Sequence, residues 1–111
     1  MNTADSFVPV TQVEEISTEE GKAFRLGDHS IALFKMDSGE IYAIENACPH
    51  IGAPLENGVI NHEKCELTCL WHGWSFDLKT GASLNYQGAK VKTLPVKISQ
   101  NQVFVDLSTL Q

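Results

Sequence analysis

The chain has 111 residues, of which 42% are hydrophobic, and this suits one compact domain that spans the whole chain, 1–111. Its 14 acidic and 8 basic residues give a formal charge of -6, which would repel the phosphate backbone of nucleic acid. The longest apolar stretches, such as 31–34, are far shorter than the roughly 20 residues that cross a bilayer. We therefore expect no nucleic-acid partner and no membrane span.

The first ten residues lack the basic and apolar regions of a signal peptide, which favours a cytoplasmic location. Three cysteines, an odd number, argue against a disulfide framework and indicate metal-binding or buried thiols. Both observations fit a reducing compartment.

Six short runs have the composition of β-strands, and small or polar turn formers separate them. In chain order they are 30–36, 40–44, 66–68, 74–78, 91–98 and 102–107. No stretch shows convincing helical periodicity, although residues 17–21 could form one turn. The sequence predicts an all-β protein built from antiparallel hairpins.

The composition changes in the middle of the chain. Residues 45–83 hold all three cysteines, three of the four histidines and both tryptophans. We interpret this segment as a functional insert in a framework of strands.

The insert contains two motifs that each pair one cysteine with one histidine. Cys48 and His50 flank one residue, and Cys69 and His72 flank two, with 18 residues between His50 and Cys69. Two thiolates and two imidazoles suit zinc or an iron–sulfur cluster with mixed ligands. Structural zinc sites usually take two similar ligands from each motif, so the mixed pairs favour a binuclear cluster with both thiolates on one iron.

These motifs resemble those of the Rieske family, whose pattern is Cys-x-His followed by Cys-x-x-His. The surrounding residues Cys48-Pro49-His50-Ile51-Gly52-Ala53-Pro54-Leu55 and Cys69-Leu70-Trp71-His72-Gly73-Trp74-Ser75-Phe76-Asp77 are also typical of it. The resemblance implies one 2Fe-2S cluster held by Cys48, His50, Cys69 and His72. It also implies an antiparallel β framework, a sandwich or barrel, with a cluster-binding subdomain at about 45–83. The separation between the motifs is slightly longer than is common in small Rieske ferredoxins.

The remaining candidates have less specific signals. Cys65 could pair with Cys69, but that choice would leave a histidine without a role, so a buried or solvent-facing thiol is favoured. His29 and His62 lie among turn residues, and we interpret both as surface histidines. Trp71 and Trp74 are either core residues or a wall that excludes water from the cluster.

Charge counting explains why two histidine ligands raise the reduction potential. An oxidised cluster with two thiolates and two neutral imidazoles has no net charge, so it accepts an electron more easily than a cluster with four thiolates. Rieske centres consequently lie at about -150 to +300 mV, against about -400 mV for plant-type ferredoxins. By resemblance, the Rieske proteins of respiratory chains add a disulfide and two hydroxyl donors. The corresponding positions here are Ala53, Trp71, Trp74 and Phe76, so we expect a potential near the low end.

The sequence implies no open coordination position, and so favours electron transfer over chemistry on a substrate. By resemblance, the chain is expected to be a monomeric ferredoxin between a flavin-dependent ferredoxin reductase and a terminal, often ring-hydroxylating, oxygenase. Two alternatives stay open. One is the small subunit of an assimilatory nitrite reductase, working with its large subunit, to which 52–58 bears some likeness. The other is a zinc-stabilised binding module.

Overall fold

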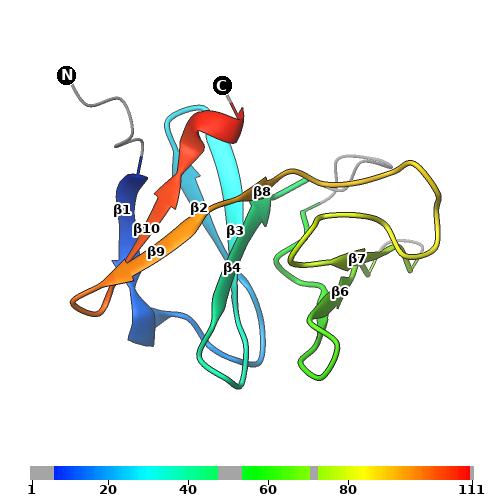
Figure 1. The fold of residues 1–111 in the computed structure, drawn as a ribbon, viewed down its shortest axis with the longest axis horizontal. Coiled ribbons are helices and arrows are strands. Elements are labelled where there is room, and N and C mark those ends of the chain that lie inside the picture. Colours follow the sequence, from blue (N-terminus) through cyan, green and yellow to red (C-terminus); the bar gives the residue numbers. More distant parts are fainter. Residues whose placement is uncertain (1–6, 48–53, 71–72, 111) are drawn as a thin grey trace.

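The protein is described from a computed structural model, which describes residues 7–47, 54–70 and 73–110. Within these residues, ten strands form three antiparallel sheets (Figure 1). The first sheet contains β1 (Phe7–Gln12), β10 (Gln102–Asp106) and β9 (Val96–Ser99), in that order. The second contains β2 (Lys22–Leu26), β3 (His29–Lys35), β4 (Ile41–Glu45) and β8 (Thr93–Leu94). The third contains β5 (Val59–Asn61), β6 (Glu66–Thr68) and β7 (Ser75–Asp77).

The predicted all-β class is confirmed. Within the described ranges, the helical elements are 3-10 turns at Val13–Glu15 and Leu107–Leu110. None of the helices in that part of the chain has the length and apolar character needed to cross a membrane. Residues 17–21, which could have formed one helical turn, bend instead, and the Ser17 hydroxyl accepts a hydrogen bond from the Glu19 amide at 2.9 Å.

The sheet that contains β3 is buried on both faces. Successive side chains of a strand point to opposite faces, so Ile31 and Leu33 enter one core while Ala32 and Phe34 enter another. The first core joins this sheet to the first sheet, through residues such as Val103 and Val105 of β10. The second core joins it to the third sheet and its loops.

The second core packs the remaining sheet against the framework. It gathers Leu67 of β6, Phe76 of β7, Leu55, Leu78 and Val91 around Phe34. All of these side chains are at most 1% exposed, and burying one of this size contributes about 1.5 to 3 kcal/mol. Figure 1 shows the third sheet and its long loops at one end of the molecule, beside β4.

The predicted strands are found with small shifts, and one of them is divided. Residues 91–98 were expected to form one strand, but β8 and β9 lie on either side of Pro95 and belong to different sheets. Proline cannot donate to a ladder, and here it marks the point where the chain passes between sheets. Strands β1, β2 and β5 were not predicted. Pro9 and a register shift between Pro9 and Thr11 obscure β1, and β5 is only three residues long.

His62 connects the third sheet to the framework, which the sequence did not indicate. Its Nε2 lies 2.6 Å from the Thr18 carbonyl oxygen, and its Nδ1 accepts a hydrogen bond from the Asp37 amide at 3.2 Å. The tautomer protonated at Nε2 satisfies both contacts. The side chain is half-buried, so this histidine links three segments rather than simply facing solvent.

We expect His62→Ala to lower the free energy of unfolding by about 1 to 2 kcal/mol, because two hydrogen bonds between separate segments are lost. Chemical denaturation of the cluster-loaded protein measures this change. His29→Ala is the matched control and should cost less than about 0.5 kcal/mol. Equal losses in both variants would contradict the connecting role.

Candidate metal centre

Of the four predicted ligands, Cys69 lies within the described residues. Cys48, His50 and His72 lie outside them, as do Ala53 and Trp71. Cys69 directly follows β6 and is 1% exposed. Its amide donates a hydrogen bond of 2.6 Å to the Trp74 carbonyl oxygen, so the chain turns back on itself between these two residues. Cys69 therefore lies at the start of the connection between β6 and β7, and Trp74 lies at its end.

Gly73 makes this turn possible. Its φ is +68°, in the left-handed region where glycine carries no steric penalty. The side-chain nitrogen Nδ2 of Asn85 donates a hydrogen bond of 3.0 Å to the Gly73 carbonyl oxygen. The side-chain oxygen Oδ1 of Asn85 accepts one of 3.3 Å from the backbone amide of Ser75. A single carboxamide on the facing loop thus fixes the chain after the predicted ligand His72.

Asn46 has the corresponding place beside the first motif. Its side-chain oxygen accepts hydrogen bonds from the amides of Leu55, at 2.7 Å, and Glu56, at 3.2 Å. Its amide nitrogen donates to the Glu56 carboxylate at 2.7 Å and to the Ser30 hydroxyl at 3.3 Å. Asn46 therefore holds together the two ends of the segment that contains Cys48 and His50.

The sequence analysis did not find Asn46 or Asn85. A signal for Asn46 was available, because it lies two residues before Cys48 and asparagine commonly bonds nearby backbone groups. No such signal exists for Asn85, since its contacts depend on how the loop after β7 folds back.

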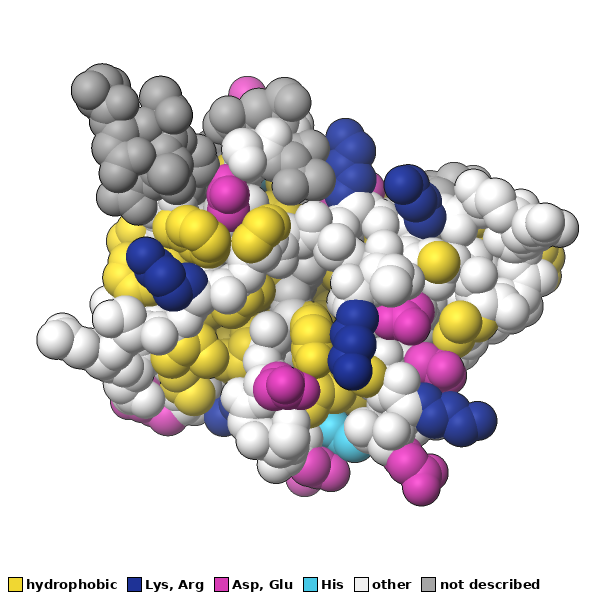
Figure 2. All heavy atoms as spheres, viewed as in Figure 1, with side chains coloured by type: hydrophobic (Ala, Val, Ile, Leu, Met, Phe, Trp, Pro, Cys, Tyr) yellow, Lys and Arg dark blue, Asp and Glu magenta, His cyan; other side chains and the backbone are white. Residues whose placement is uncertain are grey.

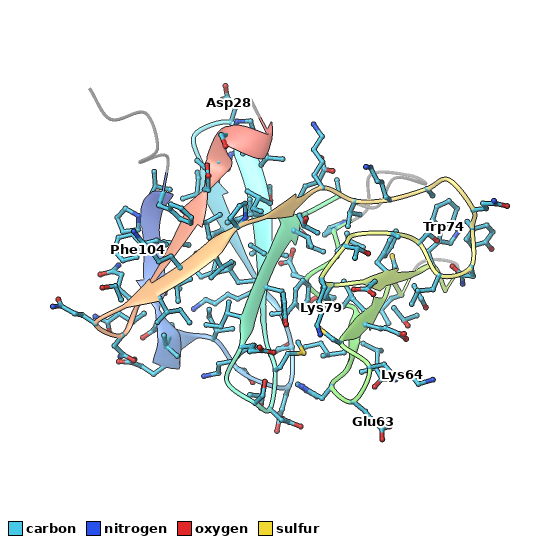
Figure 3. The ribbon with its side chains drawn as sticks, viewed as in Figure 1. Asp28, Glu63, Lys64, Trp74, Lys79 and Phe104 are labelled. Atoms are coloured by element: carbon cyan, nitrogen blue, oxygen red, sulfur yellow. The ribbon has the colours of Figure 1, made fainter. Side chains whose placement is uncertain are left out.

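Trp74 lies beside this turn and is half-buried. Its ring stacks on Tyr86 with the centroids 4.1 Å apart, and it also packs near Phe76, at 6.4 Å. Figure 3 shows Trp74 at the end of the molecule, where the loop between β7 and β8 passes close to it. This placement fits the predicted apolar wall and ties that loop to the turn after Cys69.

Cys65 is a buried thiol in the second core, 9% exposed. Burial raises the pKa of this thiol, and a hydrogen bond with Tyr42 and the charge of Lys79 offset the rise only in part. Burial, together with the Glu40 carboxylate that accepts its hydrogen bond, also raises the pKa of Tyr42. Cys65 is therefore a buried thiol of the second core, one of the two roles that the sequence favoured for it.

The donor set fits a cluster with mixed ligands. Cys69 provides a buried sulfur at the turn after β6. The sequence supplies one further thiol, from Cys48, and two imidazoles, from His50 and His72. Within the described ranges no group of three His, Cys, Asp or Glu side chains forms a separate metal site.

A family model for the Rieske 2Fe-2S domain matches residues 6–95. The chain therefore belongs to the Rieske family, and it carries one 2Fe-2S cluster. Among curated relatives, the ferredoxin component of the naphthalene 1,2-dioxygenase system of Pseudomonas aeruginosa is 38% identical over 92 residues, covering 82% of this chain and 79% of that protein. Human apoptosis-inducing factor 3 is 33% identical over 100 residues, covering 89% of this chain. The chain spans only 16% of the length of that relative.

Solved structures agree with the fold. The ferredoxin of carbazole 1,9a-dioxygenase from Nocardioides aromaticivorans IC177 superposes with a TM-score of 0.81 at 27% identity, covering 89% of this chain and 95% of that one. A protein described as an NADH-dependent nitrite reductase small subunit from Mycobacterium tuberculosis gives 0.82 at 20% identity, covering 89% and 92%. The second likeness concerns the fold alone.

We expect Asn46→Ala to destabilise the protein by about 2 kcal/mol and to lower the iron and sulfide content per chain, because the ends of the first motif's segment are released. Asn57→Ala is the control, since Asn57 is exposed on the neighbouring turn. Metal and acid-labile sulfide analysis together with chemical denaturation measure both effects. Full cluster content and unchanged stability in Asn46→Ala would rule out its positioning role.

Substitution of the two described cysteines should have opposite outcomes. Cys65→Ala is expected to keep two irons and two sulfides per chain and to cost about 1 kcal/mol from the lost packing. Cys69→Ala removes a thiolate ligand and is expected to lose the cluster. Iron, sulfide and visible absorption measurements distinguish the two, and cluster loss in Cys65→Ala would show that the ligand set is wrong.

Proposed function

We propose that Cys48 and Cys69 bind one iron of the cluster, that His50 and His72 bind the other, and that the protein carries single electrons. The segment 45–83 is then the cluster-binding subdomain of a one-domain chain. The observation that supports this most directly is the buried sulfur of Cys69 at the turn that leads to His72. When bound, the cluster supplies reversible one-electron reduction.

The chain's own residues position and shield the centre. Asn46 and Asn85 fix the backbone beside each motif, and Trp74 with Tyr86 limits the access of water. Phe76 has no hydroxyl and is fully buried, and Trp74 donates no hydroxyl group either. The absence of hydroxyl donors at these two positions favours the low end of the Rieske potential range.

We further propose that the protein is a cytoplasmic, monomeric ferredoxin that receives electrons from a flavin-dependent reductase and passes them to a terminal oxygenase. The similarity to ferredoxin components, which covers 79% to 95% of their length, supports this role. The nitrite reductase alternative has less support, because two structures described as nitrite reductase small subunits share 22% and 20% sequence identity with the chain.

The purified protein is expected to contain two irons and two acid-labile sulfides and to accept one electron at a potential in the lower part of about -150 to +300 mV. Elemental analysis and a spectroscopic redox titration measure these quantities. One zinc without sulfide would refute the cluster assignment, and a potential in the upper half of this range would refute the argument from missing hydroxyl donors.

Turnover assays identify the acceptor. The reduced protein is expected to support substrate oxidation by a ring-hydroxylating oxygenase, such as that of the naphthalene 1,2-dioxygenase system, with a flavin reductase as the electron source. Turnover by a sirohaem nitrite reductase large subunit, without turnover by oxygenases, would instead favour the alternative role.

A further inference from the structure

Strand β9 is an open edge of its sheet. In the described part of the chain it pairs with β10 and with no other strand. The opposite edge of the same sheet, β1, contains Pro9 and a register shift, and both features hinder the addition of a further strand. The pairing of β9 is regular, and the ammonium group of Lys97 lies 5.0 Å from the ring centroid of Phe7 and 5.5 Å from that of Phe104, over the neighbouring strands. The free edge of β9 is therefore not blocked by this charge.

The register of β9 shows which backbone groups face the free edge. The turn after β9 has two residues, with φ values of +52° and +68°, so Ser99 before it forms a hydrogen-bonded pair with its partner on β10. Bonded and non-bonded pairs alternate along an antiparallel ladder, and the hydrogen bond of 3.0 Å from the Asp106 amide to the Pro95 carbonyl oxygen agrees with this alternation. The N–H and C=O groups of Val96 and Ile98 therefore point away from β10, toward the free edge.

A groove runs along this edge, between β9 and β4. One part of it, with a volume of about 250 Å³, is lined by Ile98, which is 45% exposed, and by Val96, Ile41 and Tyr42. The last three residues also line an adjoining cavity of about 600 Å³. Figure 1 shows β9 and β4 close together near β8 and spreading apart below it, and Figure 2 shows apolar side chains in yellow on this face. Because β8 pairs with β4 only beyond Tyr42, no strand of the described residues fills this space, which we call the β4–β9 groove.

The two ends of the β4–β9 groove differ in charge. Lys79 lines one end, and Figure 3 shows it between β4 and the third sheet. Neither of the two ion pairs among the described residues includes Lys79. Glu40 lines the other end, together with Ile98. A carboxylate on an occupant of the groove is therefore attracted to the Lys79 end and repelled from the Glu40 end.

We propose that the β4–β9 groove binds the carboxyl-terminal segment of a partner protein, which adds to β9 as an antiparallel strand. The backbone of this segment bonds to Val96 and Ile98, and its alternate apolar side chains cover the groove. Because β9 runs from Val96 to Ser99, the carboxyl end of an antiparallel strand lies beside Val96, which lines the same cavity as Lys79. The terminal carboxylate then meets the lysine. This inference does not depend on the proposed electron-transfer role.

A second copy of the chain fits this edge less well. If two β9 strands pair through Val96 and Ile98 of both copies, Lys97 of one copy lies opposite Lys97 of the other. Like charges directly opposite each other destabilise a sheet. The occupant is therefore a different protein.

A short synthetic peptide of alternating threonine and valine, acetylated at its amino end, tests the proposal on the cluster-loaded protein by isothermal titration calorimetry. The peptide with a free terminal carboxylate should bind saturably, and the same peptide with a terminal amide should have a Kd at least about threefold higher. Lys79→Gln should remove this difference, whereas Lys64→Gln, at an exposed lysine between β5 and β6, should leave it unchanged. Absence of saturable binding, or a preference for the carboxylate that survives Lys79→Gln, would overturn the proposal.

A proline substitution separates the backbone contact from the apolar contact. Ile98→Pro removes an N–H group that does not bond to β10, so the ladder between β9 and β10 stays intact. Ile98→Ala is the matched control, because it loses the same side chain and keeps the N–H group. The Kd of Ile98→Pro for the carboxylate peptide should be at least about fivefold above that of Ile98→Ala. Equal Kd values for the two variants would refute backbone pairing with β9.

Amide hydrogen exchange, followed by nuclear magnetic resonance, locates the peptide without any substitution. The bound peptide should slow exchange of the Val96 and Ile98 amides at least about fivefold, whereas the Lys97 amide, already bonded to β10, should change less than about twofold. Equal slowing at all three amides would indicate general stabilisation and would overturn the proposed contact. Sedimentation that shows a dimer dissociated by the peptide would place a second copy in the groove, which would also overturn it.

Discussion

Strand β3 is buried on both of its faces, and the position of the third sheet, which contains β5, β6 and β7, depends on this burial. Ile31 and Leu33 face the core shared with β10, while Ala32 and Phe34 face the core shared with β6 and β7. Because a shift of one residue would exchange these two sets of side chains, the pairing of β3 with β2 and β4 fixes both interfaces at once. The framework thereby determines where the turn after Cys69 lies.

The loops beside the proposed ligands depend on side-chain amides rather than on further sheet pairing. Asn46 bonds to the backbone after the first motif, and Asn85 bonds to the backbone after the second. Each carboxamide both donates and accepts, so one residue can satisfy several backbone groups on a loop that has no ladder partner. The two cores are thus combined with described backbone beside each motif that a side-chain amide holds in place, which suits a centre that changes charge without changing shape.

The sequence predicted the all-β class, six regions of strand and the segment that carries the ligands, because these depend on local patterns. Alternation, turn formers and the spacing of Cys48, His50, Cys69 and His72 are all visible within short windows. What it did not predict depends on long-range contacts. The division at Pro95, the connecting role of His62 and the contact of Asn85 with Gly73 arise only when distant segments meet. Of the three strands that were missed, β5 is only three residues long and β1 contains Pro9 and a register shift, so the patterns of these two are weak.

The central claim is that two histidines, one from each motif, coordinate the cluster. Pulsed electron paramagnetic resonance of the reduced protein, prepared with ¹⁵N-labelled histidine, tests it most directly. The account predicts hyperfine coupling from two imidazole nitrogens in the intact protein, with His29→Ala and His62→Ala leaving both couplings in place. A reduced cluster without nitrogen coupling, or one that loses a coupling when His62 is replaced, would contradict the assignment.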